Sequence, residues 1–188
     1  MSPIKVDGNW TEGYAMDKHV IHSEHLGYDQ FGYDIYDTTR SELGELVYKM
    51  KYNGHNDTSE EIVNIITPFL DDWLIDKNIN CILPVPPTIQ RTFQPVFVIA
   101  KKIADKYGIA YDDTVLKKIA SVAAKDMTRE HKSVEGTIVK LKNASSRRNI
   151  LLIDDLYSTG STANECVKIL KCDPNIDNVY FLAITKTR

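Results

Sequence analysis

The chain has 188 residues, of which 43% are hydrophobic and 26% are charged, and these values predict one soluble globular domain with its own core. A formal net charge of −3 argues against a protein that binds nucleic acid mainly through its charge, and no apolar run reaches the roughly 20 residues of a membrane-spanning helix. Three cysteines without a C-x-x-C pair, behind an N-terminus unlike a signal peptide, lead us to expect a cytoplasmic protein with reduced thiols.

Residues 1–40 are predicted to form an N-terminal extension of strands and turns. The segment is rich in tyrosine and glycine and shows little helical period. Turns at 25–27 and 30–32, each ending in glycine, would close hairpins. The spacing of His19, His22 and His25 could suggest metal ligands, but without a helical period the three need not face one way, so a non-metal interpretation is favoured.

Residues 41–188 are predicted to form the core, beginning with two helices. Ser41 is a suitable N-cap for a helix whose apolar residues recur at i, i+3, i+4 and i+7. Thr58 and Glu61 have the spacing of a capping box in front of a longer amphipathic helix. Pro68 lies inside that second pattern and should kink or interrupt the helix.

Strands and helices then alternate along the chain. Short strands are predicted at 81–83, 115–119, 150–153 and 179–185, and a helix should begin at Pro95. Strands separated by helical patterns of this length indicate βαβ units and a parallel sheet. Because ligands bind such sheets outside the carboxyl ends of the strands, the site should lie there.

The most informative stretch follows the strand at 150–153. Asp154 and Asp155 are followed by a loop of serine and threonine around Gly160 and then by an amphipathic helix. The loop and the helix N-terminus would offer N–H groups to a phosphate, whereas the two carboxylates would repel a phosphate and accept hydrogen bonds from sugar hydroxyls. The alternative is an ordinary strand-to-helix junction in which one aspartate caps the next helix.

This stretch resembles the phosphoribosyl-pyrophosphate (PRPP) signature of type I phosphoribosyltransferases. The resemblance implies an α/β, Rossmann-like core with a parallel sheet and a small N-terminal hood. It implies that Asp154 and Asp155 bind the ribose 2′- and 3′-hydroxyls. The residues implied to wrap the 5′-phosphate are Tyr157, Ser158, Thr159, Gly160, Ser161 and Thr162.

The proline-rich segment after the strand at 81–83 narrows the resemblance. It is similar to the pyrophosphate loop of the ComF-like branch, and its implied pyrophosphate residues are Pro84, Val85, Pro86, Pro87 and Arg91. The alternative is a stiff strand-to-helix turn with a surface arginine. The chain departs from that branch in two ways. Residues 1–40 contain no cysteine for the zinc module of many relatives, and the motif that follows the pyrophosphate loop in that branch is only partly matched here.

A charged segment at 124–140 has no apolar period. The resemblance implies a hood loop that closes over PRPP, in which Arg129 and Lys132, together with Lys125 and His131, would neutralise the departing pyrophosphate. A solvated loop is the alternative. The other basic clusters, Lys117–Lys118 and the lysines and arginines of 140–148, are interpreted as a solvated face.

The predicted function is the transfer of a phosphoribosyl group from PRPP to a nitrogen acceptor with release of pyrophosphate. Mg²⁺ is the expected cofactor, bound through the substrate and not by protein side chains. The acceptor is an unidentified base or amine, and the first 40 residues would either cover it or pack against a second subunit in a homodimer. Two alternatives stay open: a PRPP- or nucleotide-sensing regulator without turnover, and a ComF-like accessory of DNA uptake.

Overall fold

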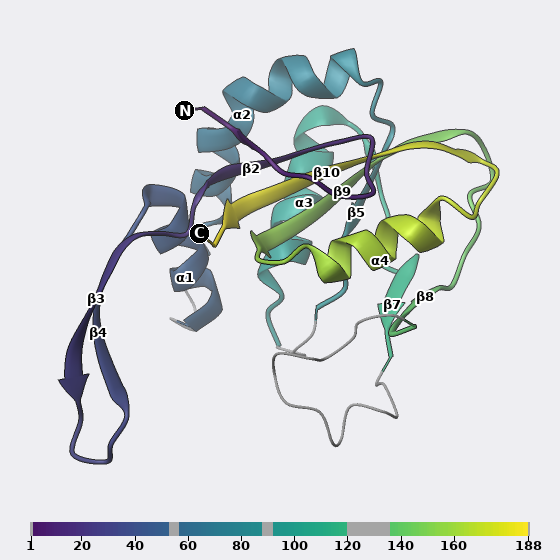
Figure 1. Cartoon of the computed structure of the whole chain (residues 1–188). Helices are drawn as coiled ribbons and strands as arrows, with labels where there is room; N and C mark the ends of the chain where they lie inside the picture. Colours follow the sequence, from purple (N-terminus) through teal and green to yellow (C-terminus); the bar gives the residue numbers. More distant parts are fainter. Residues whose placement is uncertain (1, 53–56, 88–91, 120–135, 188) are drawn as a thin grey trace.

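A six-stranded sheet forms the centre of the molecule in the computed structural model, which describes residues 2–52, 57–87, 92–119 and 136–187 (Figure 1). The strand order is β1-β2-β10-β9-β5-β6, and all neighbours are parallel except β1 and β2. The strands are β1 (Ile4–Lys5), β2 (Glu12–Lys18), β5 (Cys81–Pro84), β6 (Ala110–Tyr111), β9 (Arg148–Tyr157) and β10 (Ile176–Lys186). The predicted α/β class with a parallel sheet is confirmed.

Two apolar layers cover the sheet because its central strands are buried on both faces. In β9, Leu151 and Ile153 pack into one core, while Ile150 and Leu152 pack into the other. Three helices cover the first face, and one helix with a two-stranded ribbon covers the second. These elements are α1 (Glu42–Tyr52), α2 (Ser59–Asp76) and α3 (Pro95–Tyr107), then α4 (Ser161–Leu170), β7 (Leu116–Lys118) and β8 (Ile138–Lys140).

Helix α1 begins as the sequence predicts and lies very close to the end of β2. The Ser41 hydroxyl accepts a hydrogen bond from the Gly44 backbone N–H at 2.9 Å, which is the geometry of an N-cap. A Cβ atom on Gly44 would lie only 2.1 Å from the backbone oxygen of His19. Glycine at this position therefore allows the helix to approach the strand, and α1 keeps its apolar face buried.

Helix α2 differs from its prediction in two details. Thr58 makes no capping hydrogen bond, and its hydroxyl donates to the backbone oxygen of Leu46 at 3.0 Å, which ties α2 to α1. The Ser59 N–H is instead accepted by the Asp57 carboxylate at 2.9 Å. The helix also runs past Pro68 without interruption, since burial of its apolar face outweighs the loss of one backbone hydrogen bond.

The first 40 residues divide between the sheet and a projecting hairpin. Strands β1 and β2 join the central sheet, whereas β3 (Val20–Tyr28) and β4 (Asp34–Arg40) form a two-stranded ribbon that reaches away from it (Figure 1). The turn predicted at 30–32 joins the two strands and is confirmed. The turn predicted at 25–27 is wrong, because these residues stay within β3 as a local irregularity of its pairing. The domain boundary at residue 40 stays a prediction.

The strand predicted at 115–119 is confirmed as β7 but lies outside the central sheet. It pairs antiparallel with β8, which occupies the last residues of the segment 124–140 that was predicted to be a hood loop. The strands at 81–83, 150–153 and 179–185 are confirmed as β5, β9 and β10. Within the described ranges, no helix has the length and apolar character needed to cross a bilayer.

Candidate functional site

The proline-rich segment and the acidic pair lie side by side at the carboxyl edge of the sheet. Strand β5 pairs with β9, and Pro84 lies opposite Ile153, the residue before Asp154. The Val85 N–H continues this ladder by donating to the Ile153 oxygen at 2.8 Å. The predicted proximity of the two loops is therefore confirmed for residues 84–87.

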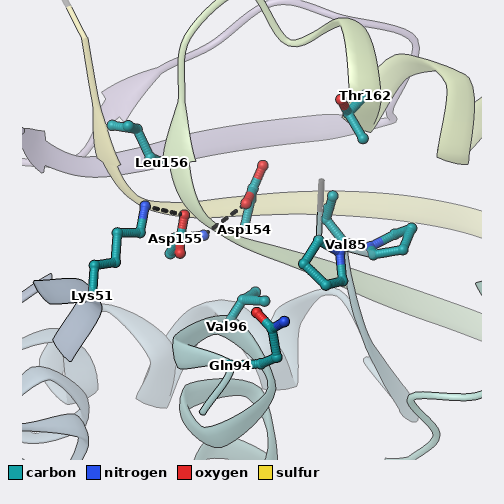
Figure 2. Close-up of a pocket in the computed structure, with 10 residues that line it drawn as sticks. Lys51, Val85, Gln94, Val96, Asp154, Asp155, Leu156 and Thr162 are labelled. Atoms are coloured by element: carbon teal, nitrogen blue, oxygen red, sulfur yellow. Dashed lines mark hydrogen bonds and ion pairs between the residues drawn. The ribbon is translucent and has the colours of Figure 1, made fainter. Parts of the chain in front are cut away.

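A cavity of about 270 Å³ opens between these two segments. Figure 2 shows the two carboxylates on one side of it, the proline-rich segment facing them and α1 contributing a lysine. The residues that line it are Lys51, Val85, Pro86, Pro87, Gln94, Val96, Asp154, Asp155, Leu156 and Thr162. The cavity thus collects polar groups from four separate elements.

A smaller cavity of about 100 Å³ adjoins the first and is formed by the hydroxyl loop. Three residues line both cavities, namely Asp154, Leu156 and Thr162. The remaining lining residues of the small cavity are Tyr157, Ser158, Thr159, Gly160, Ser161 and Ala163. The six loop residues singled out in the sequence are therefore brought together around one hollow.

The hydroxyl loop keeps its shape through Gly160, which is the N-cap of α4 and has a φ of 72°. A Cβ atom there would also approach the Tyr157 ring to 2.7 Å. Both the positive φ and this close contact therefore require glycine. The Thr159 hydroxyl accepts a hydrogen bond from the Ser161 N–H of α4 at 3.3 Å, and the alternative in which Asp154 or Asp155 caps this helix is wrong. Because the first N–H groups of a helix have no partner within it, this end of α4 offers donors to an anion.

Asp154 has an unusual protonation equilibrium. Burial first, and then the neighbouring Asp155 carboxylate, raises the pKa of Asp154 to about 7. Only partial compensation comes from Lys51 and from the Asp155 N–H, which donates to Asp154 Oδ1 at 2.8 Å. The surrounding protein therefore leaves the negative charge of Asp154 poorly balanced, and a ligand that donates hydrogen bonds or brings a cation would stabilise it.

Lys51 is a site residue that sequence reasoning did not place in the site. Its Nζ lies 2.8 Å from Asp155 Oδ1, and the two side chains are only 12% and 16% exposed (Figure 2). The available signal was its position four residues after Val47, on the apolar face of α1. A lysine on that face needs a buried partner, but the pattern could not show which carboxylate supplies it.

Asp155 is also supported from behind by a short hydrogen-bond chain. The Thr185 hydroxyl donates to the Asp155 backbone oxygen at 3.1 Å, and His19 Nδ1 lies 3.1 Å from that hydroxyl. Since the hydroxyl proton is used toward Asp155, Nδ1 must be the donor of the second bond. Burial, with Lys51 and Arg40 nearby, lowers the pKa of His19, which favours this neutral tautomer.

The three histidines do not converge on one point. His19 contacts Thr185 on β10, whereas His25 lies on the hairpin with Nε2 2.9 Å from Asp34 Oδ1. Among the residues whose placement is described, no group of three or more His, Cys, Asp or Glu side chains is arranged to hold a metal ion.

Several predicted site residues lie outside the described residues. They are Arg91 of the proline-rich segment and Arg129 and Lys132 of the charged segment, together with Lys125 and His131. Their roles toward pyrophosphate stay predictions.

Comparisons with known proteins identify similar folds but no sequence family. No family model matches the chain, and no curated protein matches it significantly. Adenine phosphoribosyltransferase from Saccharomyces cerevisiae, solved with an imino-altritol bisphosphate and adenine, is similar over 87% of this chain and 84% of its own, with 11% identity and a TM-score of 0.51.

Two further solved structures match with lower scores. The Giardia lamblia enzyme complexed with 9-deazaadenine matches over 88% of this chain and 94% of its own, with 13% identity and a TM-score of 0.48. UMP synthase from Leishmania donovani matches over 87% of this chain and 33% of its own, with 14% identity and a TM-score of 0.43. At these identities the likeness concerns the backbone, and of these three structures the yeast enzyme, with a TM-score above 0.5, supports the fold assignment. The chain therefore has the fold of a type I phosphoribosyltransferase.

Proposed function

We propose that the protein binds PRPP at the carboxyl edge of the sheet and transfers its phosphoribosyl group to a nitrogen acceptor. One observation carries the proposal: two adjoining cavities share a wall at Asp154, and one is lined by hydroxyl and helix N-terminal groups while the other is lined by carboxylates, Lys51 and the proline-rich segment. A sugar with a phosphate at one end and a pyrophosphate at the other needs this sequence of environments.

Each part of PRPP has a matching environment. The 5′-phosphate would occupy the small cavity, where Gly160 permits close approach of the backbone and α4 directs its N-terminus. The ribose hydroxyls would donate to Asp154 and Asp155 in the large cavity. The pyrophosphate would then lie toward residues 84–87, which form the opposite wall.

The residues present fit Mg²⁺ bound through the substrate. The Asp154 carboxylate has a raised pKa and so lacks a full counter-charge in the protein, whereas Asp155 is already paired with Lys51. The ribose hydroxyls and pyrophosphate oxygens of the substrate would hold the ion, and the Asp154 carboxylate would accept hydrogen bonds from those hydroxyls. When bound, Mg²⁺ supplies positive charge that stabilises the pyrophosphate leaving group.

The proposed reaction forms a bond between an acceptor nitrogen and ribose C1 and breaks the bond between C1 and the pyrophosphate oxygen. Pyrophosphate leaves with the bonding electron pair, and the acceptor nitrogen gives up its proton to water. The chain contributes mainly position: the hydroxyl loop fixes the phosphate end, and the two carboxylates fix the ribose. Lys51 holds the Asp155 carboxylate in position for this task through their ion pair.

The acceptor belongs to the class of nitrogen bases and amines. The yeast and Giardia structures similar to this chain are named as adenine enzymes with adenine or 9-deazaadenine bound, which makes purines the first acceptors to test. No described residue of the large cavity identifies one base, so pyrimidines and simple amines belong in the same panel.

The test is calorimetric titration of the whole chain with PRPP in the presence of Mg²⁺, followed by measurement of pyrophosphate release with each acceptor. We expect binding, together with release for at least one acceptor. Ribose 5-phosphate and inorganic pyrophosphate serve as partial ligands that should each bind more weakly than PRPP.

The outcomes separate the alternatives. Binding of PRPP without release for any acceptor would replace the transferase with a PRPP-sensing regulator that uses the same cavities. Absence of PRPP binding would overturn the proposal. In that case a role that needs no PRPP, such as the accessory of DNA uptake, becomes the next hypothesis to test.

A further inference from the structure

A second cavity, of about 240 Å³, lies at the amino edge of the same sheet and is named here the amino-edge pocket. The strands β5, β9 and β10 contribute residues near their first positions, Cys81, Ile150 and Ile176. The segment 142–145 closes it from the other side. Since Arg148 and Asp154 are six residues apart on β9, the pocket begins about 20 Å from the candidate site.

Among the described residues that line the pocket, one positively charged side chain has no ion-pair partner. Asp112 is paired with Lys142 at 3.1 Å, and Asp173 is paired with Lys140 at 2.8 Å. Arg148 is half-buried, and within the described ranges no ion pair or hydrogen bond involves its guanidinium. The interpretation of residues 140–148 as a merely solvated face is therefore wrong at Lys140, which is 13% exposed, and at Arg148.

Apolar side chains form much of the remaining wall. Leu83 and Ile150 are buried, and Val115, Ile176 and the Tyr111 ring extend the same surface. An inorganic anion on Arg148 would leave this surface in contact with water, and an uncharged apolar molecule would leave the guanidinium unpaired. The wall and the cation together select a molecule that has both features.

We propose that the amino-edge pocket binds a small anion with an apolar body, which lies against Leu83 and Ile150 and whose carboxylate or phosphate pairs with Arg148. The guanidinium offers a planar fork that matches either anion with two hydrogen bonds. Asn143 and Ser145 at the rim provide further polar groups. This proposal is independent of PRPP binding, because none of its residues lines the carboxyl-edge cavities.

The cysteines provide an internal readout. Cys81 lines the pocket and is half-buried, whereas Cys172 is exposed elsewhere. The whole chain, without PRPP, is treated with iodoacetamide while benzoate or phenyl phosphate is titrated, and alkylation of each cysteine is followed by mass spectrometry. We expect either probe to slow alkylation of Cys81 by tenfold or more at saturation and to leave Cys172 unchanged.

Two variants test the charge. Arg148→Gln should lower the apparent affinity with which the probe protects Cys81 by at least tenfold. Arg147→Gln should leave that affinity unchanged, because it changes an exposed arginine paired with Asp177. Ala110→Phe, on the edge strand β6 at the mouth of the amino-edge pocket, should abolish the protection of Cys81. This variant keeps the proposal testable if Arg148→Gln does not fold.

Probes that lack either the apolar body or the anionic group complete the test. Inorganic phosphate and benzyl alcohol should each protect Cys81 at least tenfold more weakly than the aromatic anions. Equal protection by either one, equal loss in Arg147→Gln and Arg148→Gln, or no protection by benzoate and phenyl phosphate would overturn the proposal. The better of the two aromatic probes identifies the preferred anionic group.

Discussion

Two aspartates at opposite edges of the sheet show how this molecule treats charge differently at its two ends. Asp173, at the amino edge, is paired with Lys140 and accepts backbone hydrogen bonds from Ala144 and Asn175, and these contacts lower its pKa to about 2. Asp154, at the carboxyl edge, has its pKa raised to about 7. The first carboxylate is stabilised by the protein itself, whereas the second is left for a ligand to stabilise.

The same contrast holds for the ends of β9. Between them, Ile150 to Ile153 are buried in the two cores and carry no charge. The carboxyl end presents acid and hydroxyl groups suited to a sugar phosphate, while the amino end presents Arg148 beside an apolar wall. A parallel sheet thus separates two chemically different sites that share their central strands.

The strongest test of this comparison removes the carboxyl-edge charges. Asp154→Asn combined with Asp155→Asn should weaken PRPP binding by about two to four orders of magnitude, because each charged hydrogen bond contributes about 1.5–3 kcal/mol. Calorimetry with Mg²⁺ measures the change. Asp72→Asn, which neutralises an exposed carboxylate on α2, is the matched control and should bind like the original chain. Near-normal affinity in the double variant would contradict the ribose assignment.

A second test changes the loop and not the charge. Gly160→Ala should weaken PRPP binding about tenfold, because its Cβ would displace the Tyr157 ring and reshape the small cavity, whereas the cost of about 1–2 kcal/mol for a left-handed alanine falls on stability. Gly108→Ala is a close control, because Gly108 has a φ of 63° at the end of α3 but open space around its Cβ position. Both variants should lose thermal stability. Only Gly160→Ala should lose affinity, and equal affinities would contradict the phosphate assignment.

A third test uses pH at the carboxyl edge. Ribose hydroxyls donate to an ionised carboxylate, so PRPP affinity should rise by about tenfold between about pH 6 and about pH 8 as Asp154 loses its proton. Titration calorimetry across this range measures the rise, which should disappear in Asp154→Asn. A flat profile in the original chain would contradict the role of Asp154.

The same ionisation affects stability with a defined sign. The pKa of Asp154 is higher in the folded chain than the unfolded value of about 4. The contribution of Asp154 to the stability of the fold is therefore fully present below about pH 4 and is lost as the pH rises through about 7. Thermal melts of the ligand-free chain should show that loss, and Asp154→Asn should remove it.

The smallest expected effect is the pH dependence of stability that Asp173 causes at the amino edge, and its sign is opposite to that of Asp154. The pKa of Asp173 lies below its unfolded value, so the stability that it contributes is present above about pH 4 and is lost as the pH falls toward about 2. Asp173→Asn should be less stable than the original chain near neutral pH, and the two melting curves should converge in acid.

Local patterns predicted the parts of the fold that depend on local physics. The strand, acidic pair, loop and helix of 150–170 follow from an apolar run, a glycine and helical spacing, and α3 follows from its terminal proline and glycine. The proximity of residues 84–87 to Asp154 followed from the rule that parallel strands end at one edge.

Contacts between residues distant in the sequence were not predictable in this way. Lys51 and Asp155 are 104 residues apart, and only the packing of α1 on the sheet brings them together. Thr58 has the spacing of a capping box, yet its hydroxyl bonds to a carbonyl on α1 and caps nothing. Arg148 lies in a basic cluster whose composition resembles any solvated face, and its pocket exists only because four strands begin beside it.

Gly44 has a consequence for how the site would tolerate mutation. A larger residue there would collide with the His19 backbone and push α1 outward, and a helix transmits such a shift along its axis as a nearly rigid rod. Lys51 lies about 10 Å further along the same helix. We therefore expect a deep mutational scan to find Gly44 as intolerant as the carboxylates themselves, although it lines neither carboxyl-edge cavity, because it sets how far the ammonium group of Lys51 lies from its carboxylate.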